Sequence, residues 1–138
     1  MNKTFEYKTT VTIGDTNAMQ NMYYLNFFKL QGIVRELFVK KNVKSGFQDL
    51  INGMLLITKD ARCNFKKDFF LYDDITMKLN FTKIRKTSVR ANFDFIHSKT
   101  KELHATGSQT IVFADSQHNV IKIPDNWADA ARQFFVEI

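Results

Sequence analysis

A run of twenty residues from Met22 to Lys41 carries apolar side chains at helical spacing around almost its whole circumference. The apolar positions are Tyr24, Leu25, Phe27, Phe28, Leu30, Ile33, Val34, Leu37 and Phe38. A helix that is apolar all round is normally buried on most of its sides. Because a chain of 138 residues forms one domain, the pattern predicts a central helix wrapped by a sheet.

The apolar period changes from helical to two after a connection over residues 42–53. We predict strands over residues 4–13, 54–66, 74–83, 87–97 and 102–114, followed by a short extended segment over 120–123. Short polar turns join the later strands as antiparallel neighbours. Pro124 suits the first turn of a C-terminal helix, in which Trp127 and Phe134 recur at helical spacing.

This order of elements predicts an α+β fold with one antiparallel sheet wrapped around a long central helix, which is the hotdog architecture. We expect a single domain over residues 1–138, because no linker or repeat interrupts the chain. An α+β sandwich of the cystatin-like or ketosteroid-isomerase-like kind is the alternative. Those folds usually place more helix before a longer sheet, or lay a helix across one open face.

The composition argues against secreted, membrane-spanning and metal-binding proteins. The N-terminus has no apolar run typical of a signal peptide, and no stretch approaches a bilayer span, so we expect a cytoplasmic protein without membrane contact. Cys63 is the only cysteine, and the three histidines, His97, His104 and His118, are interpreted as surface residues. We therefore expect no metal site and no cofactor.

The net charge of +6 favours acidic partners. Aromatic residues do not interleave with the basic ones, as a platform for stacking bases would require, so nucleic acid is not expected. The basic residues form either an ordinary solvated surface or a surface that attracts an acidic carrier protein or the phosphates of coenzyme A.

The stretch from Val11 to Phe38 joins a strand, a polar loop and the start of the buried helix. A buried helix start offers free backbone N–H groups and partial positive charge, which suit an oxyanion. Structural interpretations remain open for the same residues. Asp15 can cap a turn, Arg35 can pair with Asp15 or Glu36, and Tyr23 and Tyr24 can be core aromatics.

This stretch resembles the signature of hotdog thioesterases of the 4-hydroxybenzoyl-CoA thioesterase type, with a loop that reads Gly-Asp-Thr-Asn. Ordinary acyl-CoA enzymes have a catalytic Asp where Asn17 stands here, and Asn is neither nucleophile nor base. The thioesterases of enediyne polyketide biosynthesis share this departure. The matching segments are Asp15-Thr16-Asn17, Asn21-Met22-Tyr23-Tyr24, Leu30-Gln31-Gly32 and Arg35-Glu36-Leu37-Phe38. Phe27 stands where that family often has a Tyr.

The resemblance implies a thioesterase that releases an acyl or β-ketoacyl chain from the phosphopantetheine arm of an acyl carrier protein or polyketide synthase carrier domain. It implies catalytic roles for Asn17, Tyr24 and Arg35. It implies substrate contacts for Asp15, Tyr23, Phe27 and Gln31. An acyl-CoA thioesterase and a non-catalytic hotdog module that binds acyl chains or a carrier protein are the alternatives.

The resemblance also implies a homodimer or homotetramer with active sites between protomers. The long alternating strands support it, because they leave a sheet edge that needs cover. We further expect an apolar acyl channel near Asn17 and Arg35, lined by phenylalanines together with Met19, Met22 and Met54.

Overall fold

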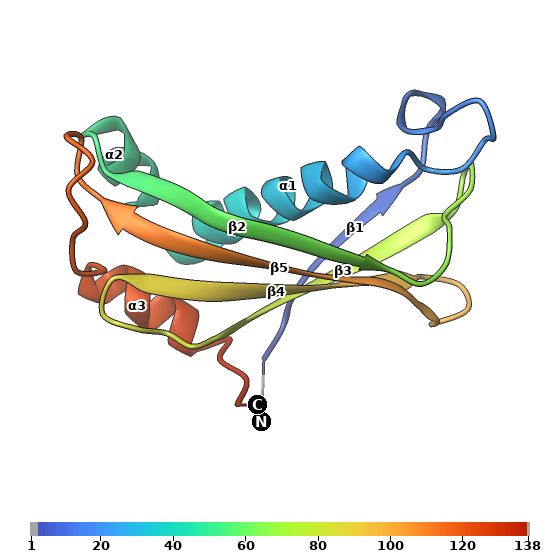
Figure 1. The fold of residues 1–138 in the computed structure, drawn as a ribbon. Helices are drawn as coiled ribbons and strands as arrows, with labels where there is room; N and C mark the ends of the chain where they lie inside the picture. The colour runs from blue at the N-terminus through green and yellow to red at the C-terminus, as the bar shows by residue number, and fades with distance from the viewer. Residues whose placement is uncertain (1–2, 138) are drawn as a thin grey trace.

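A computed structural model describes residues 3–137 as one antiparallel sheet with a long helix lying along it (Figure 1). The strands are β1 (Phe5–Thr10), β2 (Leu55–Phe65), β3 (Asp74–Thr82), β4 (Ser88–His97) and β5 (Leu103–Ala114). They are arranged in the order β1-β3-β4-β5-β2. The helices are a 3-10 turn at Ile13–Asp15, α1 (Tyr24–Asn42), α2 (Gly46–Ile51) and α3 (Asp125–Arg132). The predicted α+β hotdog fold is confirmed.

The core lies between the sheet and α1. Strands β3 and β4 alternate strictly, so that Met77, Leu79, Phe93 and Phe95 face the helix with at most 1% of their surface exposed. The intervening positions of β3, and those of β4 up to Asp94, carry polar side chains on the opposite face. Register is fixed by this alternation, because a slip of one residue would expose the whole apolar set.

Helix α1 differs from the prediction of a helix buried on most sides. Only one stripe of it is buried, at Phe27, Gln31, Val34 and Phe38, which are spaced for a single helix face. Leu25, on the other side, is 50% exposed. The sheet of one chain covers only the side of α1 that faces it, so the apolar outer side remains open.

Strand β2 is a long sheet edge. It pairs with β5 on one side, and no other described strand pairs with its outer side. The register shifts between Thr58 and Asp60, which leaves Lys59 as an extra residue, or β-bulge. An edge of eleven residues presents unpaired backbone groups that usually require cover.

The C-terminal region closes one end of the core. In the short segment over 120–123, Val120 forms an isolated antiparallel bridge with Ala114. Trp127 of α3 is buried, and its indole Nε1 donates to Asp49 of α2 at 2.7 Å. Figure 1 shows α3 at the same end of the sheet as α2.

Two of the three histidines contradict the prediction that they are surface residues. His104 is 6% exposed and stacks on Phe69, with ring centroids 4.5 Å apart. His97 lies 5.3 Å from His104 between ring centroids and faces Asp73. The prediction failed because it rested on the position of these histidines near strand ends, where the loop that carries Phe69 covers them.

Candidate active site

Arg35 projects from α1 into a polar chain that connects the helix to two strands. Its Nη1 donates to Thr58 Oγ1 of β2 at 2.7 Å and to Gln109 Oε1 of β5 at 2.8 Å. Gln109 in turn donates to Gln31 Oε1 at 3.0 Å, and Gln31 donates to the carbonyl of Arg62 at 3.1 Å. The bulge in β2 begins at Thr58, where the hydroxyl meets the guanidinium.

Gln31 is completely buried between the helix and the sheet, which its polar character allows only because its amide is hydrogen-bonded at both ends. Gly107 makes room for it. A Cβ at position 107 would lie 2.1 Å from Gln31 Nε2. Because position 107 of β5 is a glycine, Gln31 has room to hydrogen-bond Gln109, which in turn accepts from Arg35.

Among the described residues, the charge of Arg35 has no close counter-ion. No carboxylate oxygen among residues 3–137 lies within 4.0 Å of it, so neither suggested ion pair, with Asp15 or with Glu36, is formed. Burial lowers the pKa of the guanidinium, and the Coulombic field of Glu36 opposes this in part. A desolvated cation whose described partners are neutral groups attracts an anion.

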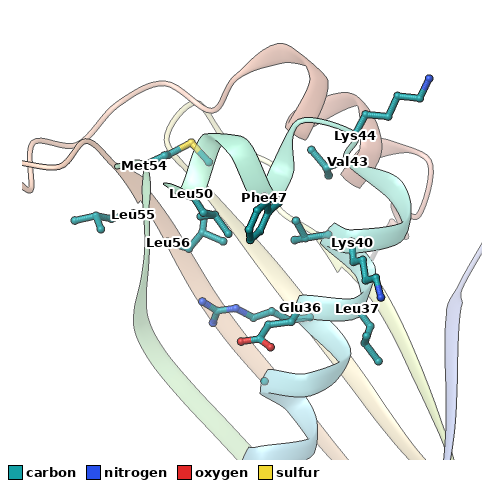
Figure 2. Close-up of a pocket in the computed structure, with 13 residues that line it drawn as sticks. Glu36, Leu37, Lys40, Val43, Lys44, Phe47, Leu50, Met54, Leu55 and Leu56 are labelled. Carbon is teal, nitrogen blue, oxygen red and sulfur yellow. The ribbon is translucent and has the colours of Figure 1, made fainter. Parts of the chain in front are cut away.

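Arg35 also lies on the wall of an apolar pocket of about 770 Å³ (Figure 2). The lining comes from the second half of α1, from α2 and from the start of β2. Its apolar members are Leu37, Val39, Val43, Phe47, Leu50, Met54, Leu55 and Leu56. Its charged members besides Arg35 are Glu36, Lys40 and Lys44. This composition suits a ligand with a long apolar part and an anionic or polar group near Arg35.

The predicted channel lining is only partly found. Met54 lines the pocket, whereas Met22 is buried in the core and Met19 is 78% exposed on the loop. Of the fourteen phenylalanines, Phe47 alone lines this pocket. The pocket reaches Arg35, but Asn17 does not contribute to its wall within one chain.

The polar loop before α1 is organised by its own hydrogen bonds. Asp15 Oδ2 accepts from the backbone N–H and the hydroxyl of Thr12 at 2.9 and 3.0 Å, so this carboxylate holds the 3-10 turn. Asn17 Oδ1 accepts from the N–H of Met19 at 3.0 Å. Asn26 of α1 donates to the carbonyl of Asp15 at 2.7 Å, which ties the loop to the helix start.

Three aromatic residues were predicted to contact substrate or catalyse. Tyr23 and Tyr24 are exposed, with rings 4.8 Å apart, and contact with Tyr24 raises the pKa of the Tyr23 hydroxyl. They are therefore not core aromatics of the single chain. Phe27 is buried, 4.9 Å from Phe65 and 5.1 Å from Phe95 between ring centroids. The predicted substrate contacts of all three stay predictions.

The predicted catalytic residues do not all meet within one chain. Arg35 stands eleven residues after Tyr24 on the same helix, which separates the two by about 16 Å along the axis. Asn17 lies beyond the helix start, on the side away from Arg35. The structure brings together Gln31, Arg35 and their strand partners at one place, and Asp15, Asn17 and the tyrosines at another.

Sequence reasoning missed Thr58, Gln109 and Asn26 as parts of the site. The segment Gly107-Ser108-Gln109-Thr110 resembles the thioesterase family weakly, and that resemblance was the available signal for Gln109. No pattern in the sequence pairs Thr58 with Arg35, because their contact depends on the packing of α1 on β2.

Within residues 3–137, His, Cys, Asp and Glu form no group of three or more that could hold a metal ion. None of the helices described there has the length and apolar character required to traverse a bilayer.

The sheet packed along α1 is the hotdog fold of thioesterases. The family model of the thioesterase-like superfamily matches residues 11–132, and the chain belongs to that superfamily of thioester hydrolases. No curated protein matches the sequence.

Solved structures share the architecture at low sequence identity. The dynemicin thioesterase, whose crystal structures concern polyene binding, superposes with a TM-score of 0.92 at 20% identity, covering 99% of this chain and 100% of that chain. A 1,4-dihydroxy-2-naphthoyl-CoA thioesterase from Synechocystis has a TM-score of 0.84 at 16% identity, with 94% and 96% covered. A gentisyl-coenzyme A thioesterase has a TM-score of 0.81 at 21% identity, with 89% and 98% covered. At these identities the likeness concerns the fold.

Proposed function

We propose that this chain hydrolyses a long apolar acyl or β-ketoacyl thioester presented on the phosphopantetheine arm of an acyl carrier protein. The observation that carries the proposal is Arg35. Its guanidinium is partly buried, has only neutral hydrogen-bond partners among the described residues, and lies on the wall of an apolar pocket. Such a cation stabilises the negative charge that develops on a thioester oxygen during hydrolysis.

In the proposed reaction, water adds to the thioester carbonyl and gives a tetrahedral oxyanion. Collapse of this intermediate breaks the carbon–sulfur bond, and the proton lost by the attacking water goes to the leaving sulfur, so that the products are a carboxylic acid and the carrier thiol. Arg35 and the amide of Asn17 donate hydrogen bonds to the oxyanion, helped by the free N–H groups of the first turn of α1 at Tyr24. A freed β-keto acid then loses carbon dioxide without a further enzyme group.

The proposed mechanism uses no catalytic carboxylate. Asn17 replaces the usual acid, and the Asp15 carboxylate is engaged by Thr12. The one carboxylate among the pocket-lining residues is Glu36, which is exposed beside Arg35. Glu36 therefore provides the sharpest test of this part of the mechanism.

We infer that the site is completed by a second copy of the chain. In one chain the start of α1 lies at the Phe65 end of β2, because Phe27 packs on Phe65. Arg35 lies at the other half of β2, beside Thr58. Antiparallel pairing of two β2 edges would bring the loop of one copy, which carries Asn17, toward Arg35 of the other.

The basic surroundings of the pocket favour an anionic carrier of the thioester, a description that fits both an acidic carrier protein and the phosphates of coenzyme A. Lys40 and Lys44 line the pocket together with Arg35, and the chain carries a net charge of +6. Carrier proteins are acidic, so the approach of one is favoured by long-range attraction.

The test compares matched substrates. Purified chain is incubated with β-ketodecanoyl carrier protein and with β-ketodecanoyl-CoA, and release of free thiol is followed. We expect turnover of both, with a higher kcat/KM for the carrier-bound chain, and loss of that preference at high salt. A higher kcat/KM for the CoA ester would assign the chain as an acyl-CoA thioesterase. Thiol release from neither would leave a binding module.

A further inference from the structure

A second, smaller cavity adjoins the pocket beside Arg35. This cavity has a volume of about 40 Å³, and it shares the wall residues Arg35, Val39, Val43 and Leu56 with the large pocket. The other residues that line the cavity are Phe38, Phe81, Val89, Ile111, Phe113, Trp127 and Ala131. Apart from Arg35, the entire wall is apolar. Cavities of this character stay dry and accept apolar groups.

Trp127 forms part of the wall of this cavity. Its ring is 5% exposed and meets Phe113 edge to face, with centroids 5.6 Å apart. Its Nε1 donates to Asp49 Oδ2 at 2.7 Å, and the same oxygen accepts the hydroxyl of Ser45 at 2.7 Å. The hydrogen bond fixes one edge of the indole while Phe113 fixes its face, so the ring is a rigid boundary.

The hydrogen bonds that Trp127 and Ser45 donate to Asp49, here called the clasp, also position the helix that lines the large pocket. Ser45 and Asp49 flank or belong to α2, whose Phe47 and Leu50 line the large pocket. Helix α2 buries little apolar surface of its own, because Phe47 is 75% exposed and Gly46 is its one buried residue. Its position therefore depends strongly on the hydrogen bonds to α3.

We propose that Trp127, oriented by Asp49, forms the end wall of the acyl channel and sets the longest chain that the enzyme accepts. The inference rests on the proposed function, since it takes the large pocket as the acyl site. From Arg35 to Val43, α1 offers a path of about 12 Å along its axis, with Val39 between them on the shared wall. A chain with its carboxyl carbon at Arg35 runs along this path and points its last carbons at Trp127.

The single tryptophan of the chain makes the proposal directly measurable. Two dodecanoate probes, which mimic the acid product, are compared: one brominated on the last carbon and one brominated close to the carboxylate. Bromine quenches indole fluorescence only at contact. We expect both probes to bind by calorimetry with similar affinity, and only the terminally brominated one to quench Trp127. Equal quenching by both, binding without quenching, or no binding would each overturn the proposal.

A pair of substitutions on α3 tests the length limit. Ala131 lines the cavity, whereas Ala130 is equally buried but does not. Ala131→Val should weaken dodecanoate binding at least about fourfold, the effect of one lost methylene contact, and leave hexanoate binding unchanged. Ala130→Val is the matched control and should alter neither. Parallel loss for both chain lengths in Ala131→Val would refute a role in length selection, and these binding measurements stand whether or not the chain hydrolyses thioesters.

Discussion

Substitution of Arg35 affects both catalysis and folding stability, and the two effects can be measured separately. Arg35→Ala should lower kcat on the carrier-bound thioester about 10²- to 10³-fold, as loss of one oxyanion donor does. Its effect on folding should be about 1–3 kcal/mol, because Arg35→Ala leaves the buried Gln109 Oε1 without its donor, although it orphans no carboxylate among residues 3–137. Steady-state kinetics and urea unfolding, measured on the same preparation, separate these effects. A large loss of stability with kcat preserved would make Arg35 a structural residue.

Glu36 decides whether hydrolysis proceeds without a carboxylate. Glu36→Gln keeps the shape of the side chain and removes the one acidic group among the described pocket residues. We expect less than about a fivefold change in kcat, far below the effect of a lost general base. Asp15→Asn serves as the second control and should be mild as well, since Asp15 holds the turn through Thr12. A decline of hundreds of fold in Glu36→Gln would establish an acid-dependent mechanism.

Gly107 is the residue on which the buried amide chain depends. In Gly107→Ala the new Cβ would stand 2.1 Å from Gln31 Nε2, so Gln31 must move and its bonds to Gln109 and Arg62 are lost. The expected cost is about 1–3 kcal/mol of unfolding free energy. Gly32→Ala is the matched comparison in α1, where no atom lies within 4 Å of the added Cβ. That change should stabilise the helix by up to about 1 kcal/mol.

The clasp between α2 and α3 ties the stability of these elements to pH. Hydrogen bonds from Trp127 and Ser45 lower the pKa of Asp49. A carboxyl whose pKa is lower in the folded state contributes stability above its unfolded pKa, about 3.9, and loses that contribution as pH falls through the folded value. The thermal midpoint should thus fall between pH 5 and pH 2 less steeply in Asp49→Asn than in wild type. Identical slopes would show that Asp49 does not contribute.

The order of elements was predictable because strands and helices have different apolar periods. The strand from 74–83 was predicted within one residue of β3, and the long helix within two residues of α1. The exposure of the outer side of α1 was not predictable, since periodicity states which faces are apolar and not what covers them. The contacts of Thr58 and Gln109 with Arg35 were not predictable either, because tertiary packing of α1 on β2 and β5 brings these residues together.

At the scale of the whole molecule, the proposed site requires assembly, because Asn17 and Arg35 belong to separate places within one chain. We expect a dimer or tetramer by sedimentation at micromolar concentration. Asn17→Ala and Arg35→Ala should each be nearly inactive alone. When the two are unfolded, mixed equally and refolded, activity should return to about one quarter of wild type, because half of the dimers are mixed and each of these has one intact site of two.

Recovery in the mixture distinguishes a shared site from a site within one chain. If Asn17 and Arg35 acted from the same copy, every site in a mixed dimer would lack one of them, and no activity would return. The Arg35→Ala variant refolded alone serves as the control for refolding losses.

The bulge at Lys59 gives β2 one residue more than its pairing with β5 requires. Removing Lys59 would make β2 a regular strand in which Thr58 still stands opposite Ile111 and Asp60 still stands opposite Thr110. Thr58 would therefore stay on the side of Arg35, and Leu56 would stay on the wall of both cavities. Descendants of this chain can lose residue 59 by a single-codon deletion without turning either half of the strand over.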